Sequence, residues 1–461
     1  MRGRATRGAA VAVAVFLALT PAWADPPNPA PDAPQAGPEN KPQAKPDDKA
    51  NETLLGDMGG LRSAIAPYGL TLGLSETSEV LGNVSGGVRR GAIYEGLTDA
   101  NLQWDLRTAY QWPGVIYARA FQIHGRGLST NNLGNLITAS SIEGVPSTRL
   151  FELWYEHYAT DWLRLKIGQQ AADQEFIVST TSKLFVNSTF GFPALASTNL
   201  PSGGPAYPLG TPAVRLRLEP SDEIVLLAGV FNGDPAGPGA GLAQVRDPSG
   251  TSFRIGDGVL ALFEAQYNPG HSPQNGTYKI GAWFNSERFA DQHFDTAGRS
   301  LASPLSTGTP RPLGNDYSVY GVIDQPLFQE KDGPGLSAFV RAMGAPSDRN
   351  LVDFYADAGL AYKGPFGRSD DIVGIGYGYA RIGDAARLRD IDTAAVTPAF
   401  PTRSRETLLE ITYQYQVTPW WQLQPDFQYI VAPGGGIPNP NAPGRKIGDA
   451  AVFGLRTTIT F

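Results

Sequence analysis

The chain ends with the stretch AAVFGLRTTITF, residues Ala450–Phe461, whose two faces separate at a period of two residues. One set of alternate positions is mostly large and apolar: Phe453, Leu455, Thr457, Ile459 and Phe461. The other set is mostly small or polar: Val452, Gly454, Arg456, Thr458 and Thr460. In an outer-membrane β-barrel the apolar face of such a strand meets lipid, the polar face meets a watery lumen, and a terminal aromatic sits at the interface. An amphipathic edge strand of a soluble sheet alternates in the same way, so the rest of the chain is needed to distinguish the two folds.

The amino terminus has the pattern of an export signal. Three arginines precede an apolar run, residues 8–19, and the sequence Ala-Trp-Ala at residues 22–24 forms a small-x-small cleavage site. We therefore expect residues 1–24 to be a signal peptide. No later stretch approaches about 20 uninterrupted apolar residues, so the sequence predicts no membrane-spanning helix.

The composition excludes several classes of protein. The 461 residues contain no cysteine, which excludes a disulfide scaffold, thiolate metal sites and thiol nucleophiles. The formal net charge of −7 leaves no basic surface for nucleic acid, so no nucleic-acid partner is expected. The 54 glycines are typical of a chain with many strands and turns. The mean hydropathy of −0.21 fits a soluble protein and also a barrel, because only alternate barrel residues touch lipid.

Two segments precede the strand-like region. Residues 25–50 are rich in proline and lack apolar periodicity, which predicts an extended, disordered tail. This tail could be a spacer or a docking segment for an envelope component. Residues 51–67 carry apolar side chains at roughly helical spacing up to Pro67, and predict a short helical segment at the periplasmic mouth. From Tyr68 the period becomes two, so residues 68–461 are expected to form the barrel.

Sixteen strand-like runs follow, and their connections alternate in length. The runs are centred near residues 72, 104, 119, 153, 166, 215, 227, 263, 281, 320, 339, 357, 376, 410, 425 and 455. Short connections at residues 111–113, 159–161, 220–221 and 418–419 alternate with long ones at 77–91, 125–147, 171–211, 232–257, 288–314 and 383–403. A barrel with short periplasmic turns and long external loops predicts this alternation, whereas a soluble sandwich or propeller does not. The predicted fold class is an all-β, sixteen-stranded antiparallel transmembrane β-barrel.

The positions that face the lumen and the longest loop supply the candidate solute-binding residues. These are Asp105, Arg107, Glu152, Trp154, Arg164, Lys166, Asp173, Glu175, Arg215, Arg217, Arg341, Glu410 and Asp426. Guanidinium donors, carboxylate acceptors and aromatic faces suit hydroxyl-rich neutral solutes better than ions. The alternative for each position is a solvated wall residue. Arg119 stays unassigned, because Tyr117 and Phe121 share its face and the polar side of that strand is ambiguous.

The sequence contains no catalytic pattern. The four histidines lack metal-ligand spacing, and neither a Gly-x-Ser-x-Gly elbow nor a phosphate-binding loop is present. Glu152 and Glu156 are four residues apart on a strand, about 13 Å, which is too far for a glycosidase pair. Gly374, Gly376 and Gly378 alternate within a strand and predict a bare inward face against which a loop packs. We therefore expect no enzyme activity, no cofactor and no metal site.

Several stretches carry a family likeness. The strongest is TLLEITYQYQVTPWWQLQPDFQYIVAPGGG at Thr407–Gly436, followed by Glu152–Phe176, Tyr320–Gln325 with YGVIDQ, and Phe339–Asp371 with APSDRN. Together they resemble the carbohydrate-selective porins of Gram-negative outer membranes, the OprB type. The resemblance covers about Gly59 to Phe461. It implies a sixteen-stranded barrel that passes glucose and related sugars by passive diffusion, and it leaves the Pro-rich tail unplaced.

The longest connection, residues 171–211, is expected to fold into the lumen and to set the constriction. Its apolar side chains need burial, and a sixteen-stranded barrel passes solutes unselectively unless something narrows it. In that arrangement Asp173, Glu175 and Lys183 would face Arg164, Arg341 and Glu152. Packing over the barrel rim is the alternative.

The sequence thus predicts a sugar-selective outer-membrane porin. Its expected partners are small neutral sugars, outer-membrane lipid and the barrel-insertion machinery, which reads a C-terminal aromatic residue. Two other functions remain open at this point: a broader small-solute porin with a weak anion preference, and a secreted, soluble sugar-binding β protein. The oligomeric state does not follow from the sequence.

Overall fold

The computed structural model describes residues 52–272, 275–330 and 333–461. The expected signal peptide, residues 1–24, and the expected Pro-rich tail, residues 25–50, lie outside the described residues. Within the described ranges, no helix is long and apolar enough to cross a membrane.

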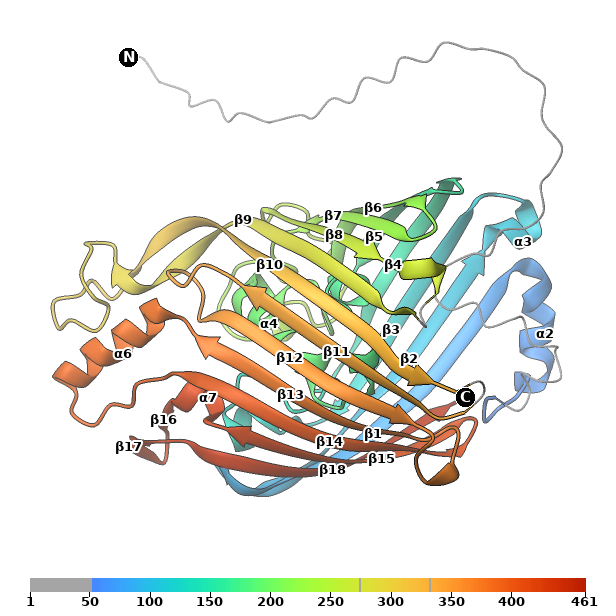
Figure 1. Cartoon of the computed structure of the whole chain (residues 1–461). Helices are drawn as coiled ribbons and strands as arrows, with labels where there is room; N and C mark the ends of the chain where they lie inside the picture. The colour runs from blue at the N-terminus through green and yellow to red at the C-terminus, as the bar shows by residue number, and fades with distance from the viewer. Residues whose placement is uncertain (1–51, 273–274, 331–332) are drawn as a thin grey trace, which may run out of the picture. The chain divides into compact units, whose positions relative to one another are not determined.

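Sixteen antiparallel strands close into a barrel (Figure 1). β1 (Leu70–Gly87) closes the ring against β18 (Gly448–Thr460). Between them lie β2 (Gly91–Asp105), β3 (Gly114–Gly125), β4 (Ser147–Thr160), β5 (Leu163–Gln170), β6 (Thr211–Ser221), β7 (Ile224–Asn232), β8 (Val259–Tyr267), β9 (Thr277–Asp295), β10 (Pro310–Gln329), β11 (Gly335–Gly344), β12 (Val352–Lys363), β13 (Ile372–Ile382), β14 (Arg405–Thr418) and β15 (Trp421–Val431). Each strand contains one of the sixteen runs found in the sequence, so the predicted fold class is confirmed.

The two sets of alternate residues in the C-terminal strand lie on the outer and the inner face of the barrel wall. Phe453 and Leu455 point outward and are half exposed, whereas Val452 is fully buried inside. On the inner face Arg456 of β18 pairs with Glu79 of β1 at 2.7 Å, and this ion pair joins the first and last strands. The final residue completes the seam, because the Phe461 N–H donates to the Leu74 carbonyl at 2.9 Å.

The two ends of the barrel differ in the length of their connections, as the sequence predicts. Two predicted loops are shorter than expected, because strands continue through residues 77–91 and 288–314. β1 and β2 leave only residues 88–90 between them, and β9 and β10 leave residues 296–309. The first error has a physical cause. Glu76 and Ser78 occupy outward positions of β1, so the apolar-out alternation that marks a strand breaks there.

Residues 58–68 form three short helices instead of one: η1 (Met58–Gly60), α2 (Leu61–Ile65) and η2 (Ala66–Tyr68). Gly59 and Gly60 have positive φ angles of 68° and 94°, which interrupts the helix. Arg62 Nη2 donates to the Phe461 carbonyl at 2.5 Å. The segment therefore lies at the short-turn end, beside the C-terminus.

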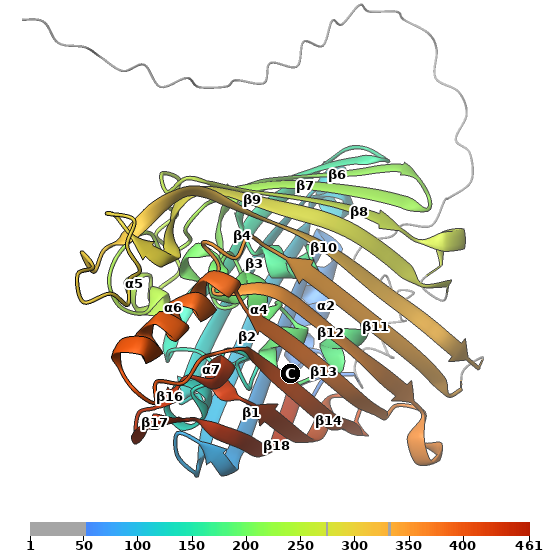
Figure 2. The same cartoon turned by 60° about the vertical axis from the view of Figure 1, so that its left-hand side comes forward.

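The remaining elements lie in the connections. Figures 1 and 2 show α5, α6, α7 and the β16–β17 hairpin together at the long-loop end, opposite α2 and α3. Their bounds are α3 (Leu106–Tyr110), η3 (Ser129–Leu133), α5 (Ala243–Arg246), η8 (Pro269–His271), η10 (Pro365–Gly367), α6 (Asp384–Val396), α7 (Pro433–Gly436), β16 (Pro438–Asn439) and β17 (Ala442–Lys446).

Candidate functional site

The connection between β5 and β6, residues 171–210, folds back into the barrel, where α4 lies inside the ring of strands (Figure 2). Its short elements are η4 (Ala172–Gln174), η5 (Thr181–Leu184), η6 (Ser188–Phe190), α4 (Ala194–Asn199) and η7 (Pro201–Gly203). Its buried apolar side chains include Phe176, Ile177, Leu184, Phe185, Val186, Phe190 and Phe192. We call this connection, residues 171–210, the lumen loop. The expectation that it enters the barrel is confirmed, and packing over the rim is excluded.

A glycine-lined stretch of the wall receives the aromatic side chains of the lumen loop. A Cβ at Gly374 would lie 2.5 Å from Leu184, and a Cβ at Gly376 would lie 2.7 Å from Phe190. A side chain at either position would therefore displace Leu184 or Phe190 from the wall. The interpretation of the alternating glycines of β13 as a bare inward face is confirmed.

Inward carboxylates of the wall accept hydrogen bonds from the backbone N–H groups of the lumen loop. The contacts are Glu264 of β8 with Ile177 N at 2.8 Å, Asp324 of β10 with Thr180 N and Thr181 N at 3.1 Å each, and Glu410 of β14 with Val186 N at 2.6 Å and Asn187 N at 3.1 Å. A buried loop must satisfy its backbone polar groups, and these acceptors do so from three sides of the barrel.

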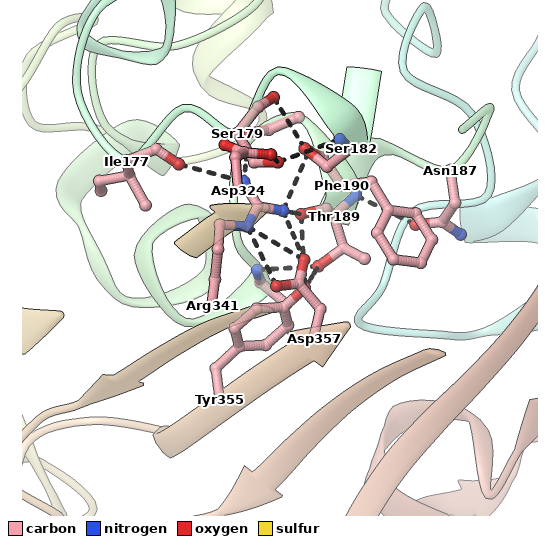
Figure 3. A network of polar contacts seen from close by, with 12 residues as sticks. Ile177, Ser179, Ser182, Asn187, Thr189, Phe190, Asp324, Arg341, Tyr355 and Asp357 are labelled. Carbon is pink, nitrogen blue, oxygen red and sulfur yellow. Dashed lines mark hydrogen bonds and ion pairs between the residues drawn. The ribbon is translucent and has the colours of Figure 1, made fainter. Parts of the chain in front are cut away.

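Arg341 of β11 donates hydrogen bonds to backbone carbonyl groups of the lumen loop (Figure 3). Its guanidinium donates to the carbonyls of Ile177 at 3.1 Å, Thr189 at 2.9 Å, Phe190 at 2.9 Å and Gly191 at 3.2 Å. Asp357 of β12 accepts from Arg341 Nε at 3.0 Å and from the Tyr355 hydroxyl at 2.9 Å. Arg341 and Tyr355 are fully inaccessible to solvent. This network fixes the loop to the wall and leaves no open face for a solute.

Three candidate residues therefore have a different role from the one expected. Arg341, Glu410 and Asp426 point inward, as alternation predicts, but they are buried. Arg341 and Glu410 bind the lumen loop, and Asp426 accepts from Gln428 Nε2 at 2.9 Å. Solutes do not reach them, because the loop covers this side of the lumen.

The opposite side of the lumen loop meets the wall at β4, β5 and β6 through ion pairs. Glu175 accepts from Arg215 Nη2 at 2.8 Å and also pairs with Lys166, while Arg215 Nη2 donates to Glu156 at 2.6 Å. Burial alone would raise the pKa of Glu175, but the charges of Lys166 and Arg215 outweigh it and hold that pKa well below its usual range. Glu175 is therefore a fixed anion at this contact.

The charge pairs expected around the lumen loop were wrong in detail. Glu175 faces Lys166 and Arg215 instead of Arg164 or Arg341. Asp173 accepts from the Tyr207 N–H at 2.8 Å, so its contact lies within the loop itself, and burial raises the pKa of its carboxyl group. Lys183 is exposed. Alternation assigns wall residues to a face, but it does not set the register of a folded loop against them.

An aromatic and charged group lies where the loop meets β2–β5, and we call it the lumen cluster: Asp99, Tyr117, Arg119, Glu152, Trp154, Lys166, Gln174 and Glu175. The rings of Tyr117 and Trp154 stack with centroids 4.9 Å apart, and Lys166 Nζ lies 4.4 Å from the Trp154 ring centroid. Arg119 pairs with Asp99 at 2.7 Å and donates to Gln174 at 3.1 Å. The Arg119 side chain is 24% exposed and that of Glu175 is 23% exposed, so both remain accessible.

The sequence prediction missed Asp99, Tyr117, Arg119 and Gln174. The signal was present, because Tyr117, Arg119 and Phe121 do share the inward face of β3. Because Phe121 is apolar, the sequence did not show that this face of β3 is the inward one. The structure explains why Phe121 faces inward. Its ring stacks on Phe151 with centroids 4.7 Å apart, beneath the loop.

A second charged group lies toward the short-turn end. Asp105 accepts from the Arg107 N–H at 3.0 Å at the start of α3, and their side chains pair at 2.7 Å. Arg107 and Arg164 lie over the ring of Tyr158, with the guanidinium carbons 4.5 and 5.0 Å from the centroid. The remaining candidate, Arg217, shares Glu219 with Arg164. These residues line the approach to the lumen cluster.

No group of three or more His, Asp or Glu side chains within the described ranges is placed to hold a metal ion. What the site offers is paired charges, amide groups and aromatic rings along a lumen. A sixteen-stranded barrel with an apolar outer face and a loop folded into its lumen defines a porin.

Comparison with known proteins agrees with this class. The family model for the carbohydrate-selective porins, the OprB family, matches residues 89–461, and the chain belongs to this family. It is an outer-membrane sugar porin, and proteins of this family are channels.

Individual relatives are distant in sequence. The chain is 24% identical to Porin B of Pseudomonas aeruginosa over 83% of this chain and 87% of that protein. A high-pH structure of Pseudomonas putida OprB matches 90% of this chain and 99% of that chain, with 22% identity and a TM-score of 0.78. A low-pH structure of the same protein covers the same shares, with 18% identity and a TM-score of 0.53. These structures share the fold of this chain.

Proposed function

We propose that this porin passes monosaccharides such as glucose by passive diffusion, without a chemical step, between the lumen loop and the wall of β2–β6. The observation that carries the proposal is the Tyr117–Trp154 stack with Lys166, Arg119 and Glu175 around it. A pyranose has apolar C–H faces that pack on aromatic rings, and its hydroxyls both donate to carboxylates and accept from cations. The lumen cluster offers both kinds of contact side by side.

The pairing of charges favours neutral solutes. Six basic side chains along this wall each have a carboxylate within ion-pair distance: Arg107, Arg119, Arg164, Lys166, Arg215 and Arg217. Paired charges leave little net field to concentrate one sign of ion, but they keep strong hydrogen-bond donors and acceptors in place. We also infer that the short-turn end faces the periplasm and the long-loop end faces the exterior, as in other bacterial barrels.

Liposome swelling tests the sugar preference. Proteoliposomes that contain the purified porin are placed in isotonic glucose, a disaccharide, an amino acid or an organic acid, and the initial swelling rates are compared. Glucose should enter faster than the amino acid and the organic acid of similar size. Equal rates for all four solutes would contradict the proposal.

A broader porin with a weak anion preference is the second candidate. One observation favours it, because Arg164 and Arg217 share the single carboxylate of Glu219 near the short-turn end. In that case the organic acid would swell the liposomes faster than glucose, and the reversal potential in a salt gradient would show anion selectivity.

A further inference from the structure

A groove lies among the connections at the long-loop end, between α6 and the β16–β17 hairpin (Figures 1 and 2). We call it the rim groove. Its volume is about 410 Å³, and it is lined by Arg389, Asp390, Thr393, Phe400, Arg403, Ile437 and Pro438. These residues come from the β13–β14 and β15–β18 connections, so none of them belongs to a strand of the barrel or to the lumen cluster.

The most buried part of the rim groove is an ion pair between Asp390 and Arg403. Arg403 Nε donates to Asp390 Oδ2 at 2.8 Å, and Arg403 Nη2 donates to Asp390 Oδ1 at 2.9 Å. The Asp390 side chain is 4% exposed and that of Arg403 is 19% exposed. Among the described residues, none accepts a hydrogen bond from Arg403 Nη1. The guanidinium is therefore held in place by two bonds and keeps a donor for a ligand.

Two further cations lie at the rim groove without a carboxylate. Arg389 is exposed and lies one helical turn before Thr393, so both side chains are on the same face of α6. Lys446 of β17 is also exposed, and its Nζ lies beside Gly436, where a Cβ would be 3.4 Å from it. Within the part of the chain that the structure describes, neither Arg389 nor Lys446 has an ion-pair partner.

The three carboxylates of α6 do not neutralise these two cations, because each already has a basic partner. The pairs are Asp384 with Arg387 at 3.1 Å, Asp390 with Arg403 at 2.8 Å, and Asp392 with His293 at 2.8 Å. The rim groove therefore differs from the wall of β2–β6, where six basic side chains are paired. An excess of positive charge at a groove attracts a negatively charged group.

The rest of the lining is largely apolar. Phe400, Ile437 and Pro438 are half-buried, so each shows part of its surface to solvent. The Thr393 hydroxyl donates to the Arg389 carbonyl at 2.7 Å, which leaves its oxygen able to accept. The volume lies within the range of about 300–1,000 Å³ that is typical of sites for small organic molecules. A simple anion would fill little of this space and would make no use of the apolar lining, whereas a pyranose has apolar C–H faces and hydroxyls.

We propose that the rim groove binds an anionic carbohydrate group, a pyranose that carries a carboxylate or a phosphate. Arg389 and Lys446 bind the anion, Arg403 donates to a hydroxyl, and the ring packs on Phe400. Such a group belongs either to a free sugar acid or to the headgroup of a glycolipid in the outer leaflet, and both present the same chemistry. The glycolipid source rests on the orientation inferred above, with the long-loop end at the exterior. The site is independent of the passage of neutral sugars past the lumen cluster.

A fluorine label beside the groove tests the proposal, because the natural chain contains no cysteine. Ala394→Cys places a thiol on α6, one turn after Asp390, and a trifluoromethyl group attached there reports on the groove by ¹⁹F NMR. In detergent, glucuronate should shift the signal with saturation, whereas glucose, which lacks the charge, and acetate, which lacks the ring, should not. An equal shift with glucose or with acetate would overturn the proposal.

Nanodiscs distinguish the two sources of the ligand. The labelled porin is placed in phosphatidylcholine nanodiscs with or without lipopolysaccharide. A signal that moves only when lipopolysaccharide is present assigns the groove to a glycolipid, and a saturable shift with glucuronate in both kinds of nanodisc assigns it to a free sugar acid. A signal that responds to neither glucuronate nor lipopolysaccharide would overturn the proposal.

A pair of variants on α6 separates the groove from other anion sites. Arg389→Gln should raise the dissociation constant of the responding ligand about ten-fold, because it removes a charged hydrogen-bond donor. The control Arg387→Gln removes the same charge from the same helix, but Arg387 does not line the groove and pairs with Asp384. Equal dissociation constants in the two variants would overturn the proposal. Glucose-driven swelling should stay unchanged in both, so this test fails or succeeds separately from the test of sugar passage.

Discussion

Arg341 shows how a single inward side chain can act on a channel without touching solute. Its guanidinium is fully buried, pairs with Asp357 and donates to four carbonyl groups of the lumen loop. Arginine suits this role because its planar group presents five donors in a fixed arrangement and stays charged. Removal would leave Asp357 without its cationic partner and would take one donor from each of the four loop carbonyls.

We predict that Arg341→Met destabilises the barrel and loosens the lumen loop. Loss of one partner of a buried ion pair costs about 3–5 kcal/mol. The unfolding temperature from heat-modifiable gel migration should fall, and single-channel current should become noisier and larger. Arg341→Met/Asp357→Leu should recover much of the stability, because no buried charge stays unpaired.

The matched control is Arg381→Met, which removes an arginine from an ion pair with Asp353 at the rim. The Arg381 side chain is 49% exposed although that of Asp353 is 3% exposed, so water at the rim can take the place of the guanidinium, and the loss should be smaller than the loss of about 3–5 kcal/mol for a fully buried pair. If Arg341→Met and Arg381→Met lowered the unfolding temperature equally, the anchoring role of Arg341 would be wrong.

Trp154 tests the aromatic part of the lumen cluster. Trp154→Ala removes the ring that stacks on Tyr117 and lies under Lys166, so a sugar loses its apolar contact. We expect weaker inhibition of ion current by glucose, with the apparent dissociation constant raised about ten-fold, equivalent to about 1.4 kcal/mol. Trp162→Ala, at the exposed β4–β5 turn, should leave glucose inhibition unchanged. A normal glucose response in Trp154→Ala would remove this ring from the sugar path.

At the scale of elements, the lumen loop divides the barrel interior into two sides. One side packs apolar rings against β11–β14 and is held by buried charges, while the other presents Gln174 and Glu175 to β3–β6. The loop enters the lumen because its apolar surface has no other place for burial, and the glycine-lined stretch of β13 provides the space.

We predict that replacement of residues 179–208 by a short Gly/Ser link raises single-channel conductance and abolishes discrimination between glucose and similarly sized solutes. A sixteen-stranded barrel without this loop is wide enough to pass them all. As a control, the β9–β10 loop at the rim, residues 296–309, can be shortened in the same way and should leave both properties unchanged. Unchanged conductance after the first replacement would show that the lumen loop does not set the constriction.

At the scale of the whole molecule, closure of the barrel depends on the seam between its first and last strands. Phe461 ends this seam, where its N–H donates to Leu74 and its carbonyl accepts from Arg62. A C-terminal aromatic residue also fits the membrane interface.

Deletion of Phe461 should lower the amount of heat-modifiable barrel in the outer membrane, because both the interface anchor and the last seam contact are lost. Phe461→Trp keeps an aromatic ring and the backbone contacts, and should assemble normally. Normal assembly of the deletion variant would show that neither the insertion machinery nor the seam needs this residue.

The sequence alone determined the properties that repeat along the chain. Period-two alternation marked all sixteen strands, the lengths of the connections separated the two ends, and the apolar content of residues 171–211 predicted a loop that needs burial. These features are local, since each follows from which side of a strand meets lipid or from how much apolar surface a segment carries. Of the two strand pairs that alternation cut short, β1 with β2 is the one in which Glu76 and Ser78 face outward.

Only the tertiary structure decided which inward residues remain available to solute. Arg341 and Glu410 look the same in sequence as Arg217 and Asp105, because alternation reports the face of a strand and not what covers it. The lumen loop covers the first two, whereas the side chains of Arg217 and Asp105 are 22% and 23% exposed. Which residues the loop covers depends on contacts between residues more than a hundred positions apart, such as Arg341 with Thr189 and Glu410 with Val186. Such contacts leave no periodic pattern in the sequence.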